Sequence, residues 1–281
     1  MGSNSEQEPP ERCFLIMDPK KTLGLVLSGG GVKGMAHLGL LRAMEEYGIE
    51  ADIISGASAG AIIGALYADG SSIDEILAFF EETPLFRFSY LSAAKPGLLD
   101  TNKYADSLER LFPGDRFEGL GKPLYVITTN MESGQWEVHD KGPLISTLLA
   151  SASMPPLFSP VEVNGCLHAD GGVMNNFPID PLLDQGLFIL GSNVVPLDPA
   201  PPADLRTSMS LLNRAQTLTW HSGIQPRLPL CDYLWEPAGI NEIQFLDFSR
   251  VREAYELGYE RAQEQMPAIQ EKLQQADAWQ A

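Results

Sequence analysis

Ser58 carries the one hydroxyl in a run of small residues, Gly56-Ala57-Ser58-Ala59-Gly60, and is the first candidate for chemistry. Apolar residues precede and follow this GxSxG pattern, which predicts a strand that turns sharply into a helix. Such a turn strains the backbone at the serine, and the glycines let neighbouring backbone approach it closely. The pattern alone fits either a nucleophilic serine or a tight packing turn.

A second glycine-rich stretch, Gly29-Gly30-Gly31-Val32-Lys33-Gly34, follows a predicted strand and opens a predicted helix. Successive N–H groups at the positive end of a helix can bind an anion, either a phosphate or the oxyanion of an acyl-transfer intermediate. The spacing matches neither a P-loop nor the dinucleotide-binding fingerprint, and no acidic residue follows where a ribose contact requires one. We therefore favour an oxyanion hole, with a glycine turn used only for packing as the alternative.

Asp170-Gly171-Gly172 follows another short predicted strand and could bring a carboxylate to the same place. A Ser–His–Asp triad would also need one of the four histidines, His37, His139, His168 or His221. Only His221 has the Ser…Asp…His order of the α/β-hydrolases, and its position in a predicted helix suits that role poorly. We expect each histidine to be structural rather than catalytic.

The elements that must position these residues alternate between strands and helices. Buried strands are predicted at 22–28, 53–55, 124–129 and 187–195, with hairpin strands at 135–139, 161–163 and 166–169. Helices are predicted at 33–47, 58–68, 71–80, 104–112, 143–153, 207–222 and 248–275. This alternation predicts an α/β fold whose mostly parallel sheet is covered on both faces.

One domain is expected over residues 21–281, after a disordered tail at 1–20. The core motifs fall in 22–195, and a C-terminal helical region covers 207–281. A length of 281 residues with 44% hydrophobic residues is enough for one substantial core.

The acidic balance limits the partners. With 37 acidic and 19 basic residues the formal net charge is −18, which repels nucleic acid and anionic membranes. No apolar run approaches the ~20 residues that span a bilayer, and the first residues do not resemble a secretory signal. Three widely spaced cysteines, Cys13, Cys166 and Cys231, fit a reducing compartment. We expect a cytoplasmic protein, with at most transient contact to a membrane surface and an oligomeric state that the sequence leaves open.

Two apolar segments could form walls beside the nucleophile. Residues 79–99 contain a cluster of aromatic side chains that fits a lid or acyl-chain wall as well as it fits plain core. Residues 207–235 include Leu211, Leu212 and Leu218, and we expect these leucines mainly to pack in the core. The final helix is rich in Glu, Gln and Arg, which predicts a solvated layer over the sheet.

Four blocks of the sequence together resemble the patatin-like phospholipases. They are Gly29–Gly34, Gly56–Gly60, Ala150-Ser151-Ala152-Ser153-Met154-Pro155 and Asp170–Gly172, in that family's order and approximate spacing. The resemblance covers about residues 22–195 and implies a three-layer α/β/α serine lipid acyl hydrolase. The expected substrate is a fatty-acyl ester of a phospholipid or simpler lipid.

The resemblance also implies roles for single residues. Ser58 would be the nucleophile and Asp170 its general base, in a dyad without histidine. The N–H groups of Gly29, Gly30 and Gly31 would form the oxyanion hole. Support for the motifs would come from Lys33, where many members carry Arg, and from Gly34, Gly56, Gly60, Gly171 and Gly172.

The dyad makes a physical demand, because an aspartate with a pKa near 3.9 is a poor base toward a serine hydroxyl. Burial would have to raise the pKa of Asp170. No metal or other cofactor is expected, because the carboxylates show no ligand spacing with histidine. Two alternatives stay open: an α/β-hydrolase-type esterase with a Ser58/Asp170/His221 triad, and a catalytically idle lipid-binding or regulatory module.

Overall fold

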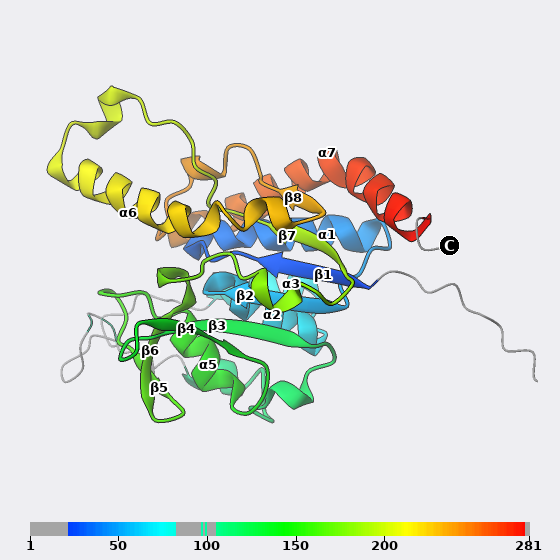
Figure 1. Ribbon diagram of the computed structural model, residues 1–281, viewed down its shortest axis with the longest axis horizontal. Helices are drawn as coiled ribbons and strands as arrows, with labels where there is room; N and C mark the ends of the chain where they lie inside the picture. The colour runs from blue at the N-terminus through cyan, green and yellow to red at the C-terminus, as the bar shows by residue number, and fades with distance from the viewer. Residues whose placement is uncertain (1–21, 83–96, 98, 100–104, 279–281) are drawn as a thin grey trace, which may run out of the picture.

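The computed structural model describes residues 22–82, 97, 99 and 105–278 (Figure 1). The strands are β1 Leu23–Leu27, β2 Ile53–Ala57, β3 Leu124–Asn130, β4 Gln135–His139, β5 Val161–Val163, β6 Cys166–Asp170, β7 Phe188–Ser192 and β8 Tyr233–Trp235. The helices are α1 Met35–Glu46, α2 Ala59–Asp69, α3 Ile73–Glu82, α4 Ala105–Glu109, α5 Leu144–Ser151, α6 Ser208–Ile224 and α7 Val251–Ala278. The tail expected at 1–20 and most of the aromatic segment 79–99 lie outside the described residues.

The strands form one eight-stranded sheet in the order β5-β6-β3-β2-β1-β7-β8, and β4 also pairs with β3. Strands β3, β2, β1, β7 and β8 are parallel neighbours, while β4, β5 and β6 join by antiparallel pairing. The mostly parallel α/β sheet and both hairpins are confirmed. The sequence analysis did not predict β8, whose three residues are too few to give a periodic signal.

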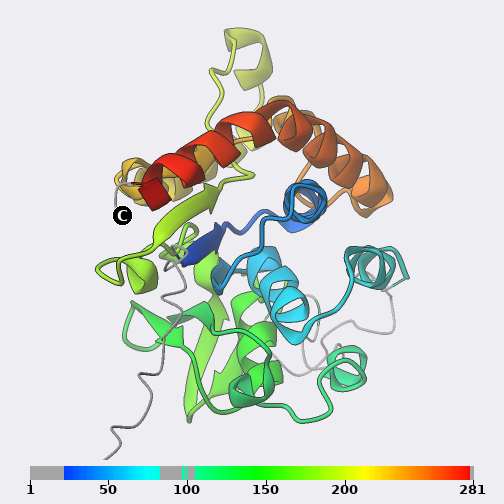
Figure 2. The same ribbon diagram turned by 90° about the vertical axis from the view of Figure 1, so that its right-hand side faces the viewer.

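Side-chain alternation along β1 divides the core into two parts. Leu25 and Leu27 point to the larger cluster, which contains the buried faces of α1, α2, α5 and α7. Val26 points to the opposite face, where it packs with Phe177 and with Ile224 at the end of α6. Figure 2 shows α1 in blue and α2 in cyan on one side of the sheet. The second outer layer is thinner, since it consists mainly of short turns between β6 and β7 and the end of α6.

The final helix α7 packs mainly on α1, and it reaches the sheet only at the edge strand β8, where Tyr233 Oη donates to Gln265 Oε1 at 3.1 Å. The predicted layer over the sheet is therefore found only at that edge. A Cβ on Gly258 would lie 2.5 Å from the Ala36 carbonyl oxygen, and one on Gly39 would lie 2.6 Å from the Tyr255 carbonyl oxygen. The two helices therefore cross in direct backbone contact, which only glycine permits. Sequence periodicity showed one polar face of α7 but not which element its apolar face would contact.

The expectation of core packing for residues 207–235 is wrong for most of α6. Leu211, Leu212 and Leu218 are exposed on this helix, whereas Trp235 on β8 is fully buried. Among the helices that the structure describes, none is long and apolar enough to cross a bilayer.

Candidate active site

Two strand ends meet on one edge of β3 and place Ser58 beside Asp170. β4 pairs with one edge of β3, along residues that also pair with β2 or β6. Because each edge of a strand takes one partner at a given position, β2 and β6 must both pair with the opposite edge of β3. β2 runs along this edge as far as Ala57, opposite Ile127. β6 approaches from the other direction and ends at Asp170, opposite Thr128. Residues 112 positions apart in sequence are thus brought together by strand pairing alone.

Ser58 occupies the sharp turn that the sequence predicted. Its φ is 54° and its ψ is −126°, values that a serine adopts only where surrounding structure holds them. Both glycines of the motif are needed for packing, because a Cβ on Gly60 would lie 2.6 Å from the Ser28 carbonyl oxygen and one on Gly56 would lie 2.6 Å from that of Gly60. Since α2 begins at Ala59, the Ser58 side chain lies at the positive end of a helix.

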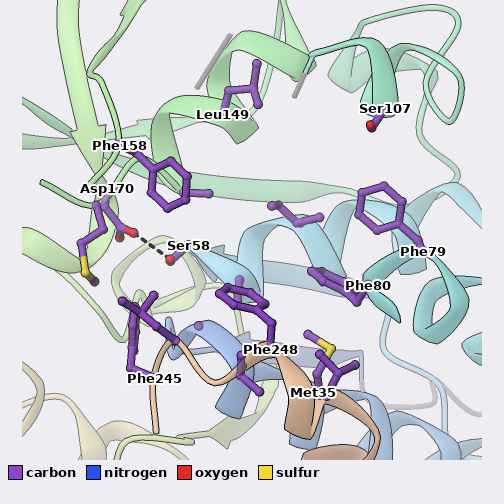
Figure 3. Close-up of a pocket in the computed structure, with 18 of the residues that line it drawn as sticks. Met35, Ser58, Phe79, Phe80, Ser107, Leu149, Phe158, Asp170, Phe245 and Phe248 are labelled. Carbon is purple, nitrogen blue, oxygen red and sulfur yellow. Dashed lines mark hydrogen bonds between the residues drawn. The ribbon is translucent and has the colours of Figure 1, made fainter. Parts of the chain in front are cut away.

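A hydrogen bond joins the two candidate catalytic side chains directly (Figure 3). Ser58 Oγ donates to Asp170 Oδ2 at 2.7 Å, and the Gly172 N–H donates to Asp170 Oδ1, also at 2.7 Å. Only 6% of Ser58 and 1% of Asp170 are exposed to solvent. The carboxylate is therefore held in one orientation, with one oxygen toward the serine.

Burial raises the pKa of Asp170 from its ordinary value of 3.8 to about 7, although the hydrogen bonds from Ser58 and Gly172 act in the opposite direction. Desolvation exceeds hydrogen bonding here, and among the described residues no cation pairs with the carboxylate. The carboxyl group of Asp170 can therefore exchange a proton near neutral pH, as the dyad hypothesis requires.

The end of α5 fixes both partners. Ser151 Oγ accepts a hydrogen bond from the Ser58 N–H at 3.0 Å and donates to the Ile127 carbonyl oxygen at 2.6 Å, which ties the turn to β3. The Asp170 N–H donates to the Ser153 carbonyl oxygen at 3.0 Å. The third sequence block is therefore a positioning element for the other two.

The glycine loop faces Ser58, but its three expected oxyanion donors are not equivalent. The Gly29 N–H donates to the Asn176 carbonyl oxygen at 3.1 Å, so this group is already used and the assignment of Gly29 as a donor needs correction. The N–H groups of Gly30 and Gly31 have no acceptor among the described residues. Gly30 and Gly31 each line a cavity that also contains Ser58.

The other motif residues pack or hold the loops. Lys33 Nζ donates to Asn241 Oδ1 at 2.5 Å, and burial lowers the pKa of this amine while the charge of Asp198 partly offsets the effect. A Cβ on Gly34 would lie 2.8 Å from that of Ala59, so this glycine allows the loop to approach α2. The bond from Lys33 to Asn241 agrees with the prediction that Lys33 supports the loop and takes no part in the chemistry.

Gly171 and Gly172 likewise permit close packing after Asp170. A Cβ on Gly171 would lie 2.8 Å from the Ile127 carbonyl carbon, and one on Gly172 would lie 3.0 Å from Asp170 Oδ1.

A cavity of about 100 Å³ opens beside Ser58 and Asp170. Its walls are mostly apolar, and Figure 3 shows aromatic rings on several sides of it. The lining includes Met35, Phe79, Phe80, Leu108, Leu149, Met154, Phe158, Phe245, Leu246 and Phe248. Phe79 and Phe80 therefore form part of the wall of this cavity. The other aromatic residues of segment 79–99 lie outside the described residues. This shape and lining suit a single acyl chain.

None of the histidines bonds to Ser58 or Asp170 in the part of the chain that the structure describes. His37 is buried and bonds to the Ser28 carbonyl oxygen and to Ser192 Oγ, and burial lowers its pKa to about 4, so it is neutral. His221 lies on α6, and its Nδ1 is buried without a hydrogen-bond partner. The geometry therefore favours the dyad over the triad alternative, because Ser58 Oγ bonds to the Asp170 carboxylate itself.

His139 and His168 come together with Glu137, which the sequence spacing did not predict. Their possible ligand atoms lie within 4.8 Å of one another, because β4 and β6 both pair with β3. Thr128 Oγ1 already bonds to one ring nitrogen of each histidine at 2.7 Å. A hydrogen-bonded network thus accounts for this cluster.

The family model for patatin-like phospholipase matches residues 25–183, which is more than half of the chain and includes Ser58, Asp170 and the glycine loop. The chain belongs to the patatin-like phospholipase family. Among curated proteins it is 29% identical over 271 residues to lysophospholipase NTE1 of Phaeosphaeria nodorum. It is 30% identical over 302 residues to patatin-like phospholipase domain-containing protein 7 of Rattus norvegicus.

These relatives are much longer proteins. The first alignment covers 85% of this chain and 18% of the relative, and the second covers 90% and 22%. The chain thus spans about a fifth of the length of the curated relatives that it matches.

Solved structures agree on the fold. VipD from Legionella pneumophila superimposes with a TM-score of 0.52 at 17% identity, over 89% of this chain and 67% of VipD. Human GIVD cytosolic phospholipase A2, in complex with methyl gamma-linolenyl fluorophosphonate, gives a TM-score of 0.52 at 13% identity, over 94% and 60% of the two chains. At such low identity these similarities concern the patatin-like fold alone.

The four patatin-like blocks of the sequence did not point to Asn176. The side-chain Nδ2 of Asn176 donates to the Gly29 carbonyl oxygen at 3.2 Å, and the backbone carbonyl oxygen of Asn176 accepts from the Gly29 N–H. A Cβ on Gly172 would lie 3.3 Å or less from the Asn176 amide group. Asn176 therefore bridges the glycine loop and the loop after Asp170. The available signal was its position six residues after Asp170, beside a second asparagine.

Proposed function

We propose that this chain is a serine lipid acyl hydrolase that cleaves fatty-acyl ester bonds through a Ser58–Asp170 dyad. The observation that carries the proposal is the 2.7 Å hydrogen bond from Ser58 Oγ to a buried carboxylate at the side of an apolar cavity. A nucleophile, a base and a place for an acyl chain are thus adjacent.

The first half of the reaction acylates the serine. Ser58 Oγ attacks the carbonyl carbon of the ester while its proton moves to Asp170 Oδ2. The tetrahedral intermediate then collapses, and the leaving alcohol takes that proton from Asp170. The pKa of Asp170, raised to about 7 by burial, brings its basicity closer to that required for this transfer.

The second half returns the enzyme to its starting state. Asp170 takes a proton from water, and the resulting hydroxide attacks the acyl carbonyl carbon. The second tetrahedral intermediate releases the fatty acid as Ser58 Oγ recovers the proton from Asp170. Each proton taken by Asp170 is returned, so the dyad needs no other base.

The negative charge on the intermediate requires donors that are already in place. The N–H groups of Gly30 and Gly31 and the N-terminus of α2 surround the position of Ser58 and would supply them. Removing one such donor commonly costs about 3–4 kcal/mol of transition-state stabilisation.

Single-chain lipids are the substrates that we favour within this class. The cavity beside Ser58 measures about 100 Å³ and has mostly apolar walls, which suits an acyl chain. One of the relatives is named a lysophospholipase, which agrees with a single-chain lipid.

A panel of esters tests the proposal. Soluble monomeric esters, monoacyl and diacyl phosphatidylcholine would be given to the wild type, Ser58→Ala and Asp170→Asn. We expect the wild type to prefer the monoacyl lipid and both variants to lose at least a thousandfold in kcat/KM. Unchanged turnover in folded Ser58→Ala would refute the assignment.

Two rivals have separate tests. A histidine-dependent triad predicts that His221→Ala abolishes activity without unfolding, whereas the dyad predicts that activity on a soluble ester is retained. An idle binding module predicts that no ester in the panel is hydrolysed by folded protein.

A further inference from the structure

Helix α6 carries its apolar side chains on the outside. The exposed fraction is 64% for Met209, 54% for Leu211, 61% for Leu212 and 45% for Leu218. In Figure 1 this helix, in yellow, extends outward past the end of β1 that leads to the glycine loop. Single exposed leucines are ordinary on protein surfaces, but four large apolar side chains on one helix form a patch.

The inner side of α6 is polar over the first part of the helix. Half-buried positions recur there at Ser210, Arg214 and Thr217, with the spacing of one helix face, and apolar residues face inward only near the end, at Trp220 and Ile224. A surface helix that only covers a core has apolar residues inside and polar residues outside along its whole length. The first part of α6 therefore presents its large apolar side chains to the surroundings of the protein rather than to the core.

The charge on α6 differs from that of the rest of the molecule. Its 17 residues include no Asp or Glu, although the chain contains 37 acidic residues. Its one basic residue, Arg214, donates to the Asp198 carbonyl oxygen at 2.9 Å. This surface can approach lipid headgroups without the repulsion that the net charge of −18 would otherwise cause.

The apolar surface of α6 continues to the active site. Trp220 on α6 lies with its ring centroid 6.2 Å from that of Phe245, and both line the small cavity that contains Ser58 and Asp170. Leu246, which lines the larger cavity, is also exposed. An acyl chain leaving a lipid surface at α6 would thus meet apolar side chains all the way to the nucleophile.

The end of α6 also passes close to the segment after Asp170. A Cβ on Gly223 would lie 3.8 Å from the Met174 carbonyl oxygen, and the side chains of Val173 and Met174 are exposed there. The last turn of α6 therefore lies beside an exposed apolar segment that follows Asp170.

We propose that α6 is an interfacial helix that seats the active-site side of this protein on an uncharged, zwitterionic phospholipid surface. The proposal rests on the proposed function, since it explains how a lipid substrate reaches Ser58. Met209, Leu211, Leu212 and Leu218 insert among the acyl chains while the helix lies in the plane of the interface. The acidic remainder of the molecule faces the water.

Sedimentation with sucrose-loaded vesicles tests this directly. The full chain carrying Ser58→Ala would be mixed with vesicles of pure phosphatidylcholine and of phosphatidylcholine with 30% phosphatidylserine. We expect binding to the neutral vesicles, weaker binding to the anionic ones, and at least a tenfold loss when Leu211→Gln and Leu212→Gln are added. Val138→Gln, which changes an apolar residue on β4 that is 41% exposed, is the control and should bind normally.

The same substitutions in active protein separate this proposal from the proposed function. The Leu211→Gln/Leu212→Gln variant should keep its kcat/KM for a soluble ester and lose at least tenfold on vesicle-borne substrate. Wild-type binding by this variant, or tighter binding to anionic vesicles, would overturn the interfacial role. A dimer that dissociates in this variant, seen by analytical ultracentrifugation without any vesicle binding, would overturn it as well. Vesicle binding without hydrolysis of any ester would instead refute the proposed function alone.

Discussion

At the scale of single residues, the burial of one carboxyl group decides how a serine without a histidine partner could react. Burial raises the pKa of Asp170 to about 7, close to that of a histidine, and no cation in the described part of the chain pairs with it. Only ionised Asp170 can accept the Ser58 proton. The pH dependence of the reaction should therefore follow the pKa of this carboxyl group.

We predict that kcat/KM for a soluble ester is constant above about pH 7 and falls about tenfold per pH unit below it. The sign follows from the raised pKa of about 7, since protonation at lower pH removes the base. Initial rates between pH 5 and 9 at constant ionic strength measure this, with Ser58→Ala as the control for uncatalysed hydrolysis. A profile that stays flat to pH 5 would mean that the carboxyl group titrates near its ordinary value.

Asn176 offers a second test at this scale. Asn176→Ala removes the hydrogen bond from Nδ2 to the Gly29 carbonyl oxygen and opens space between Gly29 and Gly172. We expect kcat to fall at least tenfold with little change in KM, because the oxyanion donors lose alignment while the acyl cavity is intact. Steady-state kinetics beside urea unfolding separates this from general destabilisation. A change confined to KM would contradict a positioning role.

At the scale of elements, the site depends on strand pairing that no local pattern predicts. The sequence identified the strands before Ser58 and Asp170, because both are short apolar runs that end at glycine-rich turns. It could not predict that β2 and β6 share one edge of β3, because register between distant strands depends on the whole sheet. Family resemblance supplied the pairing of Ser58 with Asp170 that the patterns left open.

The same reasoning explains what the sequence missed. The family resemblance implied three oxyanion donors, but the partner of the Gly29 N–H is a backbone carbonyl 147 residues away, at Asn176. Leucine content suggested that α6 packs in the core, whereas its leucines face outward. Periodicity shows that a helix has an apolar face without showing which way that face points.

Ser151→Ala tests the element that holds the turn. The change leaves the Ser58 N–H and the Ile127 carbonyl oxygen without their buried partner, so the free energy of unfolding should fall by about 1–3 kcal/mol. We also expect kcat to fall about tenfold or more, because the turn is no longer tied to β3. Thr147→Ala, on the same helix, removes a bond to the Pro143 carbonyl oxygen and should leave kcat unchanged. Equal effects of the two variants on kcat would contradict the role of Ser151 in holding the turn at Ser58.

At the scale of the whole molecule, the chain divides into an acidic body and a surface helix, α6, that has no acidic residue. The crossing of α1 and α7 holds the C-terminal helix against the element that follows the glycine loop. Stability and lipid contact should therefore depend on different parts of the chain.

The helix crossing can be tested without touching the site. Gly258→Ala places a Cβ 2.8 Å from that of Ala36, so we expect the free energy of unfolding to fall by about 1–3 kcal/mol. Gly114→Ala is the matched control, because a Cβ there meets nothing within 4 Å, and it should change stability by about 0.5 kcal/mol or less. Urea unfolding monitored by circular dichroism measures both. Equal stability of the two variants would show that α1 and α7 do not cross in backbone contact.

Covalent labelling with a fluorophosphonate, followed by mass spectrometry of peptides, tests the central claim most directly. We predict one phosphonyl adduct, on Ser58, that forms at least a hundredfold more slowly in Asp170→Asn and as fast as in the wild type in His221→Ala. An adduct on another residue, or labelling of Ser58 that does not depend on Asp170, would contradict the dyad.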